Sequence, residues 1–467
     1  MSAVQSRRVF LRGIGLAAAG GALAACGATP TAQVIEKEVV VTQVVQVEVT
    51  KLVEGTPQVV TQEVVATSTP APMSIACVGH VTLGYYTSTT PAIERMKKQE
   101  AGFNEQFPDV DLEIIQMTNT TDKYATMLAA GNEPHVMWVG TEFWQFVGGG
   151  TYLQLDPLVD SDPDFRREEY YPQPLDYFTW RGGLYALPYG MDCDIYAYNL
   201  DLVEAAGLSA PSDTWTHDDY IAYGQAMTKD TDGDGRIDEF GVTDAGWYQY
   251  VWQEGGDVLT PECDRAILDT PEAIAGLQLT YDISAGKYKI APTPDQTKES
   301  GPLPLFTTGK VGIRITYPAH MPVYRESAKF RWDVVAAPNQ KGTWFNPEGY
   351  NISARTPDKG AAWCLVKYLC SSESQRSFYA VEKSAIPAIR SIAESDVWLE
   401  GGPANMGAFA AALEYERHWP KHPISMEAWT IVQVFIDQMM AGDITAEEAG
   451  KGMTDGLNAK LVEYQGA

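Results

Sequence analysis

The alternation of strand-like and helix-like segments after residue 75 constrains the fold of this chain most. Residues 80–86 have the character of a strand, 91–107 of a helix with a proline in its first turn, and 110–117 of an alternating second strand. A helix over 121–131 then leads into the apolar run 136–139. This β-α-β-α-β order is typical of a doubly wound parallel sheet, whose ligands bind at the carboxyl ends of the strands. We therefore predict an α/β protein with a binding site at those ends.

The N-terminus has the pattern of an export signal. Arg7 and Arg8 precede a short stretch of small apolar residues, as in a twin-arginine signal, and Leu23-Ala24-Ala25-Cys26 resembles a bacterial lipobox. We expect residues 1–25 to be a signal peptide and Cys26 to carry the lipid. The mature protein is then extracytoplasmic and lipid-anchored to the cell membrane.

Residues 26–72 differ in composition from everything that follows. They contain 13 Val between Val34 and Val65, no aromatic residue, and several prolines. We interpret the segment as a flexible tether. Because β-branched residues favour strands, an added edge strand or a self-pairing stalk is the alternative.

Charge excludes one class of function. The chain has 61 acidic and 34 basic residues and a net charge of -27, so its surface repels phosphate backbones. We expect no nucleic-acid partner.

Several motifs in fixed order resemble a known family. They are Phe103 to Val110, Leu187 to Gly190 running into Tyr196 to Asn199, Ala206 to Leu208 with Thr214-Trp215, Phe306 to Val311, Gly349 to Ser353, and Ala361 to Leu369. In these residues the chain from 75 to 467 is similar to the family 1 extracellular solute-binding proteins of sugar ABC importers, the maltose-binding-protein-like group.

The resemblance implies a two-lobed periplasmic-binding-protein fold of type II, with discontinuous doubly wound lobes joined by a hinge. The N-lobe would comprise 75–190 plus 346–395, and the C-lobe 192–345 plus 397–467. It further implies a monomeric, non-enzymatic receptor that binds a neutral sugar or oligosaccharide and delivers it to the transmembrane subunits of an ABC importer. Closure of the lobes around the ligand is the expected motion.

A sugar site needs flat aromatic rings for C–H faces and carboxylates or amides for hydroxyl groups. Trp429 and Asp192 lie where the family often places such ligands, and Thr87, Ser88 and Thr89 follow the first strand. Core packing or a solvated loop is the alternative for each candidate. The full set of expected ligand-binding residues is Thr87, Ser88, Thr89, Glu142, Trp144, Asp192, Trp247, Trp252, Tyr317, His320, Trp344, Gly349, Tyr350, Asn351 and Trp429.

The stretch 230–241 matches the calcium loop of an EF-hand in most positions. Expected metal-site residues are Asp230, Asp232, Asp234, Arg236 and Asp238, with Gly235 at the sharp turn. Position 12 is Gly241 instead of a bidentate Glu. A structural Ca²⁺ is predicted, and a simple acidic turn is the alternative.

Five cysteines remain after Cys26, an odd number without a CxxC pair. Cys364 and Cys370 share one predicted helix and should not bridge each other. One disulfide is possible, with Cys193 and Cys263 as a candidate pair, and buried thiols are the alternative.

Two other functions are compatible with parts of the sequence. The same fold could bind a non-sugar solute such as a polyol phosphate or a peptide, although few basic residues near the expected cleft disfavour an anion. An extracytoplasmic glycosidase would use paired carboxylates, but no spacing in the chain supports one. The sequence contains no HExxH, GxSxG or P-loop motif.

Overall fold

The computed structural model describes residues 43–53, 56–66, 75–87, 90–118, 120–243, 246–298 and 301–465. The chain forms two compact units, Met1–Pro70 and Ala71–Ala467. The predicted signal peptide and Cys26 lie outside the described residues. No helix among the described residues is both long and apolar enough to cross a membrane.

The first unit contains a β-hairpin. Strands β1 (Gln43–Val53) and β2 (Thr56–Ala66) pair antiparallel, with Val53 opposite Thr56 at the turn and Gln43 opposite Ala66 at the open end. The self-pairing alternative describes residues 43–53 and 56–66, and the interpretation of 26–72 as a tether stays a prediction. Local β-propensity prevails here because two valine-rich strands can satisfy each other's backbone groups.

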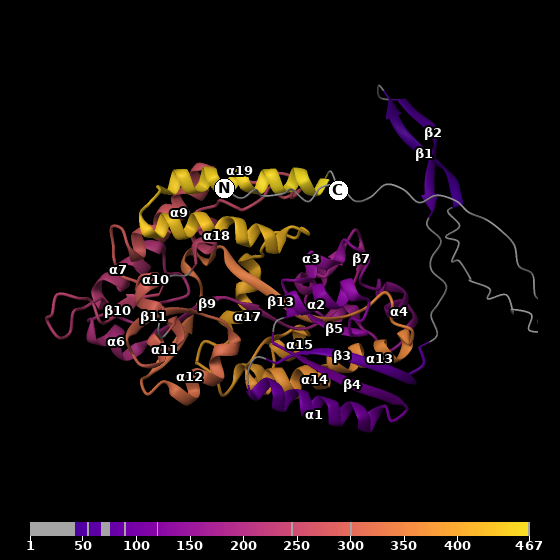
Figure 1. Ribbon diagram of the computed structural model, residues 1–467, viewed down its shortest axis with the longest axis horizontal. Coiled ribbons are helices and arrows are strands. Elements are labelled where there is room, and N and C mark those ends of the chain that lie inside the picture. Colours follow the sequence, from indigo (N-terminus) through magenta and orange to yellow (C-terminus); the bar gives the residue numbers. More distant parts are fainter. Residues whose placement is uncertain are drawn as a thin grey trace, which may run out of the picture. The chain divides into compact units, whose positions relative to one another are not determined.

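The larger unit is built around two sheets (Figure 1). The first sheet has the order β14-β8-β13-β5-β3-β4, and β15 pairs with the start of β13. Its strands are β3 (Gly79–Tyr86), β4 (Val110–Met117), β5 (Val136–Val139), β8 (Ala186–Cys193), β13 (Thr343–Ile352), β14 (Ile386–Pro387) and β15 (Glu416–Arg417). Strand β3 is parallel to β4 and β5, which confirms the predicted parallel β-α-β-α-β start.

The second sheet has the order β10-β11-β9-β12. These strands are β9 (Ile195–Asn199), β10 (Phe240–Val242), β11 (Val311–Thr316) and β12 (Trp332–Val335). A separate small ribbon joins β6 (Thr179–Trp180) to β7 (Gly183–Leu184). Asp194 alone separates β8 of the first sheet from β9 of the second, and the chain returns between β12 and β13. These two connections join the sheets, and the exact lobe boundaries given above stay a prediction.

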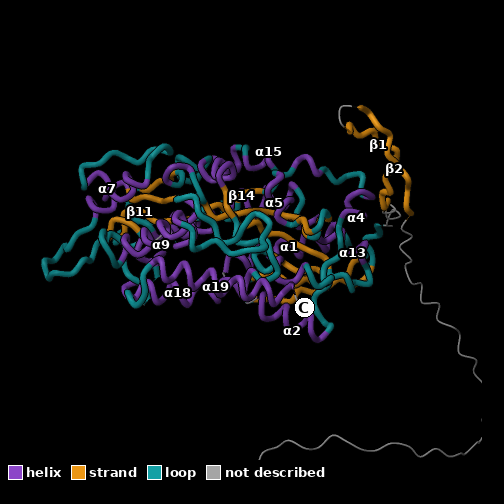
Figure 2. Tube along the Cα trace, turned by 90° about the horizontal axis from the view of Figure 1, so that it is seen from above, coloured by secondary structure: helices purple, strands orange, loops and turns teal. Residues whose placement is uncertain are grey.

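Helices cover both sheets (Figure 2). Around the first sheet lie α1 (Thr90–Gln106), α2 (Thr120–Ala130), α3 (Phe143–Val147), α4 (Asp156–Ser161), α5 (Pro172–Tyr177), α13 (Lys359–Leu369), α14 (Ser372–Ser374), α15 (Arg390–Ala393), α16 (Asp396–Leu399) and α17 (Ala408–Ala411). The others are α6 (Leu200–Ala205), α7 (His217–Met227), α8 (Trp247–Gln253), α9 (Pro271–Ser284), α10 (Pro294–Thr297), α11 (Pro302–Thr307), α12 (Met321–Ser327), α18 (Ser425–Ala441) and α19 (Ala446–Gln465).

The long helices follow the apolar periodicity of their sequences. In α1 the buried positions include Ala92, Met96 and Phe103, three to four residues apart or a multiple of that, on the face that meets the sheet and α13. At the C-terminal end of the chain, α18 and α19 pack together and α19 also contacts α9. Their shared core includes Val432 and Leu457.

A disulfide joins Cys77, just before β3, to Cys364 in α13. Gly360 allows this close approach, because a Cβ there would lie 2.7 Å from the backbone nitrogen of Ala76. The candidate Cys193–Cys263 pair is wrong: Cys193 is a buried free thiol on β8, and Cys263 is a free, partly buried thiol. Cys370 is also free, so Cys364 and Cys370 do not bridge each other, as expected. The pairing depends on where α13 docks, which spacing along the chain does not reveal.

Candidate functional site

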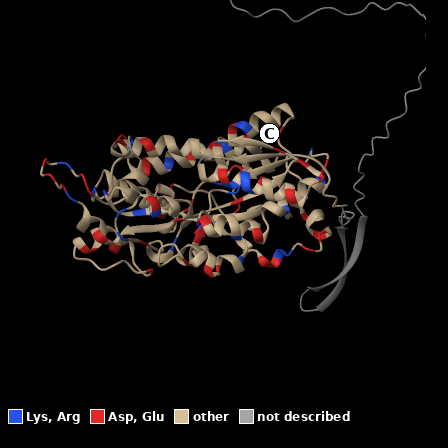
Figure 3. Ribbon diagram, turned by 90° about the horizontal axis from the view of Figure 1, so that it is seen from below, with Lys and Arg blue, Asp and Glu red and all other residues tan. Residues whose placement is uncertain are grey.

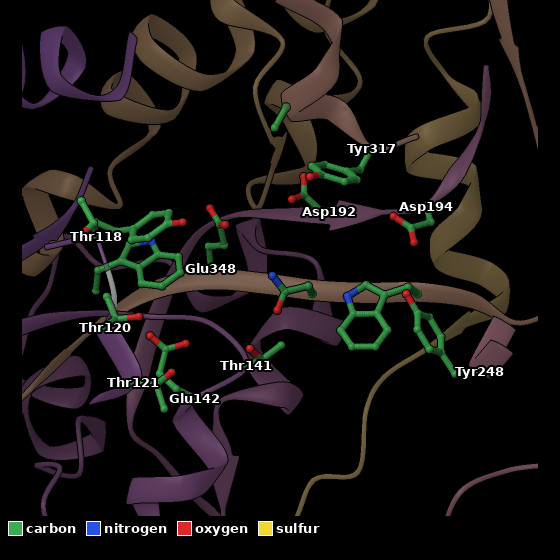
Figure 4. Close-up of a pocket in the computed structure, with 15 residues that line it drawn as sticks. Thr118, Thr120, Thr121, Thr141, Glu142, Asp192, Asp194, Tyr248, Tyr317 and Glu348 are labelled. Carbon is green, nitrogen blue, oxygen red and sulfur yellow. The ribbon is translucent and has the colours of Figure 1, made fainter. Parts of the chain in front are cut away.

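A cavity of about 650 Å³ lies where the two sheets meet (Figure 4). Strand ends and loops of the first sheet supply one part of its lining, and the segments after β8, after β11 and in α8 supply another. The lining residues are Tyr86, Thr118, Thr120, Thr121, Trp138, Thr141, Glu142, Asp192, Asp194, Tyr248, Tyr317, Ala319, Trp344, Asn346 and Glu348.

One polar stripe of the lining follows from strand geometry. Successive side chains of a strand point to opposite faces, so Trp344, Asn346 and Glu348 of β13 share the cavity face. On the neighbouring strand β8, Asp192 stands directly opposite Asn346 in the register. Two paired strands therefore set a Trp, an amide and two carboxylates side by side.

Two pairs of aromatic rings complete the lining. Tyr86 and Trp138 are stacked, with centroids 4.8 Å apart and an interplanar angle of 21°. Tyr248 and Trp344 are also 4.8 Å apart but tilted by 57°. Such rings offer flat apolar surface to the C–H face of a ligand.

The carboxylates of the cavity are hard to ionise. Burial raises the pKa of Glu142 to about 7, although hydrogen bonds from Thr120 and from the Gly140 N–H oppose the shift. Burial likewise raises the pKa of Asp194 to about 7 against a hydrogen bond of 2.5 Å from Gln249 Nε2. For Asp192, burial and the nearby charges of Glu348 and Asp194 raise the pKa well above its usual range.

A buried hydroxyl connects an aromatic ring of the site to one of its acids. Tyr189 accepts a hydrogen bond of 3.0 Å from Trp138 Nε1 and donates one to Glu348 Oε2. Burial also raises the pKa of Glu348. Tyr189 does not line the cavity itself, so it positions two side chains that do.

The structure brings four of the sequence candidates together in this cavity: Glu142, Asp192, Tyr317 and Trp344. Figure 4 shows Asp192 beside Tyr317, and Glu142 grouped with Thr120 and Thr121. Ser88 and Thr89 lie outside the described residues. Thr87 is buried between two strand ends, where its N–H donates to the Met117 carbonyl at 2.8 Å, and it does not line the cavity.

The other tryptophan candidates lie beside the cavity instead of in its lining. Trp144 is buried on α3 against Tyr177 and Trp180. Trp247 and Trp252 are buried on α8, where Trp252 Nε1 donates to Asp257 at 3.1 Å. Trp429 is partly buried on α18, with its ring 5.9 Å from Tyr248 and 6.4 Å from Trp344, behind the lining pair.

The remaining candidates serve the framework. His320 is buried beside Arg314, whose Nη1 lies 3.0 Å from its Nδ1, and burial together with that charge lowers the pKa of His320 to about 2. Gly349, Tyr350 and Asn351 lie in the stretch of β13 that pairs with β5 and β8. A Cβ on Gly349 would come within 2.5 Å of the Leu187 carbonyl oxygen, so close strand packing explains this glycine.

Sequence reasoning missed several lining residues, and two signals could have found some of them. Period-two alternation from Trp344 leads to Asn346 and Glu348, and the same step from Asp192 leads to Asp194. The threonines around the start of α2 follow the carboxyl end of β4. Because ligands bind at the carboxyl ends of such strands, these threonines could also have been predicted. Tyr248 had no such signal, because it lies on α8 among other aromatic residues that are buried outside the cavity lining.

The predicted calcium loop projects from the body between α7 and β10, and acidic positions mark it in Figure 3. Carboxylate oxygens of Asp230, Asp232 and Asp238 lie within 4.8 Å of one another. Asp230 accepts hydrogen bonds from the N–H groups of Gly233 and Gly235, at 2.7 and 2.8 Å. Asp234 lies outside this group of three, and its carboxylate accepts from the Arg236 N–H.

A two-sheet α/β body with a cavity where the sheets meet defines a solute-binding fold. Residues 86–376 match the model of the bacterial extracellular solute-binding protein family, and the chain belongs to that family. The fold is that of the type II periplasmic binding proteins, as the resemblance implied.

Relatives and solved structures agree with this assignment. The chain is 25% identical over 355 residues to a binding protein of Brucella abortus, covering 73% of this chain and 82% of the relative. It is 23% identical to a maltotriose-binding protein of Pyrococcus abyssi, covering 71% of each. The structure of an ABC substrate-binding protein from Listeria monocytogenes in complex with cycloalternan superimposes with a TM-score of 0.74 at 22% identity, covering 82% of this chain and 98% of that one.

Proposed function

We propose that this protein is an extracytoplasmic receptor that binds a sugar or oligosaccharide in the cavity and delivers it to the membrane subunits of an ABC importer, without catalysing a reaction. The observation that carries the proposal is the composition of the cavity lining. Two aromatic pairs and a row of carboxylate, amide and threonine groups supply both kinds of contact that a saccharide needs. The names of the similar proteins, which refer to maltotriose and cycloalternan, support the same class of ligand.

Binding in such a cavity requires the sheets to approach each other around the ligand. The chain connects the two sheets by short segments, at Asp194 and between Val335 and Thr343, where a single 3-10 turn covers Pro338–Gln340. Short connections of this kind can absorb a hinge rotation, and a ligand that contacts both sides favours the closed form.

Export and anchoring complete the proposal. The Arg7-Arg8 signal would direct export through the twin-arginine route, and lipid on Cys26 would hold the mature protein at the outer face of the cell membrane. A Ca²⁺ ion held by Asp230, Asp232 and Asp238, with carbonyl oxygens of the loop, would stabilise the projecting segment.

Calorimetric titration of the purified protein with mono- and oligosaccharides tests the central claim. We expect saturable one-to-one binding of at least one saccharide, together with compaction in small-angle scattering at saturation. Absence of binding across glucosyl, mannosyl and amino-sugar oligomers would contradict the proposed function. Mass spectrometry of the membrane-extracted protein tests the anchor, since acylation adds a diacylglycerol to the N-terminal peptide that begins at Cys26.

A further inference from the structure

The cavity is rich in acids and lacks bases. Glu142, Asp192, Asp194 and Glu348 all line it, and none of the described lining residues is Lys, Arg or His. A saccharide hydroxyl needs an acceptor but does not need a negative charge. The excess of carboxylates therefore calls for an explanation beyond the hydrogen bonding of neutral sugars.

Two arginines stand behind the lining, and each has other partners. Arg314 lies near Asp194, but its Nη1 contacts His320 Nδ1 at 3.0 Å and donates to the Tyr324 hydroxyl at 2.7 Å. Arg95 lies on the far side of Glu348 and pairs with Glu382 at 2.5 Å. These guanidinium groups offset Asp194 and Glu348 in part only.

The other two acids have no cation at all among their described electrostatic partners. Asp192 faces the acids Glu348 and Asp194 and the phenol of Tyr317. Glu142 faces the hydroxyl of Thr120 and, from the core, the phenols of Tyr124, Tyr152 and Tyr177, with Glu348 as its charged neighbour. Burying an anion without a counter-charge is unfavourable by several kcal/mol in general.

Acceptor atoms in the cavity also lack donors. Within the described residues, Asp192 Oδ1, Asn346 Oδ1 and Glu142 Oε1 are buried without a hydrogen bond of ordinary geometry. The Glu142 side chain is among the most enclosed, because this residue is only 3% exposed. Unsatisfied buried acceptors on two neighbouring strands and on the facing loop ask for a ligand group that donates in several directions.

We propose that the ligand is an amine-bearing saccharide whose ammonium group binds between Asp192 and Glu348, with its rings against the Tyr86–Trp138 and Tyr248–Trp344 pairs. This inference rests on the proposed sugar-binding function and refines its substrate class. An ammonium group has three donors and no acceptor, so it complements a site made of acceptors. It also supplies the positive charge that the four carboxylates lack.

The direction of proton exchange on binding separates a cationic from a neutral ligand. A neutral sugar that closes the cavity buries the carboxylates further, which favours their protonated forms and takes up protons. An ammonium ligand favours the ionised forms and releases protons. By linkage, affinity for a neutral sugar rises as the pH falls, whereas affinity for a protonated amino sugar rises as the pH rises from about 5 towards 7.

Titration calorimetry of the purified protein with chitobiose and cellobiose tests the proposal. These two disaccharides share their linkage and differ by an amine or a hydroxyl at C2. N,N′-diacetylchitobiose serves as a third ligand, because acetylation removes the charge of the amine. We expect chitobiose to bind at least about tenfold more tightly than either neutral ligand, and to release protons when titrated in two buffers of different ionisation enthalpy.

Isosteric variants locate the effect. Asp192→Asn should reduce the preference for chitobiose over cellobiose to about twofold or less. Asp295→Asn, an exposed position on α10, should keep the full preference. If Asp192→Asn fails to fold, Glu348→Gln serves the same test, because Glu348 is the other carboxylate of the proposed ammonium site.

The outcomes distinguish this inference from the function on which it rests. Equal or tighter binding of cellobiose, with proton uptake, overturns the amine proposal and leaves the sugar receptor intact. A preference for chitobiose that survives in folded Asp192→Asn or Glu348→Gln protein also overturns it. If no saccharide of any kind binds, both proposals fail.

Discussion

The cavity and the projecting loop both contain several carboxylates, but the pKa shifts of these groups have opposite directions in the two regions. In the cavity, burial raises the pKa of Glu142 and Asp194 to about 7. In the loop, backbone N–H donors from Gly235 and Gly233 lower the pKa of the exposed Asp230. The ionised form of a carboxyl group is thus disfavoured in the cavity and favoured in the loop.

The difference shows what each region lacks. The loop supplies its own donors, so its carboxylates are satisfied before any ion binds. The cavity supplies acceptors and aromatic surface but few donors, and among the described residues several of its buried acceptors have no hydrogen bond. Acidic residues that are close in the fold can therefore belong to an exposed turn that hydrogen-bonds its own carboxylates, or to a buried cavity that leaves some of them without a donor.

Replacing Glu142 should give the largest effect on this comparison. Between about pH 4.5 and 7 the native state keeps a proton on Glu142 that the unfolded chain has lost, so the free energy of unfolding falls as the pH rises through that window. The full loss is about 3 kcal/mol. Glu142→Gln cannot ionise, so it should abolish this part of the slope and stabilise the protein near pH 8. Urea denaturation at several pH values measures it, with the exposed Glu105→Gln as the control, and an unchanged slope in Glu142→Gln would contradict the burial argument.

Adding Ca²⁺ should stabilise the native protein through the loop, and a stability measurement detects this effect. An ion bound only by the native state adds RT ln(1 + [L]/Kd), about 2.7 kcal/mol at one hundred times Kd. We expect Ca²⁺ to raise the melting temperature and EDTA to lower it again, and Asp232→Ala to remove the response. The position of Asp234 outside the cluster predicts a weaker effect of Asp234→Ala. If Ca²⁺ does not change the melting temperature of the wild-type protein, the loop is an acidic turn and not an ion site.

Truncating an aromatic residue of the cavity lining should give the smallest of the three free-energy effects. It should also separate the cavity from the loop most clearly, because only the cavity variant should change sugar affinity. Truncating Trp344 removes one ring of a pair that lines the cavity, so sugar affinity should fall about tenfold, or about 1.4 kcal/mol. Asp232→Ala in the loop should leave that affinity unchanged. Trp144→Ala should instead lower stability with little change in the affinity of the folded fraction, because Trp144 packs in the core. Calorimetric titration beside thermal melts of the three variants measures both quantities, and the opposite pairing would exchange the roles of the two tryptophans.

The sequence predicted the order of elements well, because periodicity records which face of a segment is buried. The strands near 80, 110 and 136 and the helix after Thr90 all lie where the pattern placed them. Glu142 and Asp192 line the cavity as predicted because Glu142 follows the end of β5 and Asp192 lies at the end of β8, and the topology of the sheet fixes where strands end. Side-chain direction inside a helix was harder to predict: neighbours differ by about 100° around the axis, so Tyr248 faces the cavity while Trp247 turns towards Trp419.

The disulfide has a mechanical consequence for any protein held by its N-terminal end. A pull applied at residue 75 reaches Cys77 before it reaches β3, which begins at Gly79. The covalent bond passes that load to α13, a helix packed on both β3 and β13. Force therefore enters the body at two elements of the sheet together instead of peeling its first strand away from β4 and β5. The disulfide therefore protects β3 from being pulled out of the sheet first.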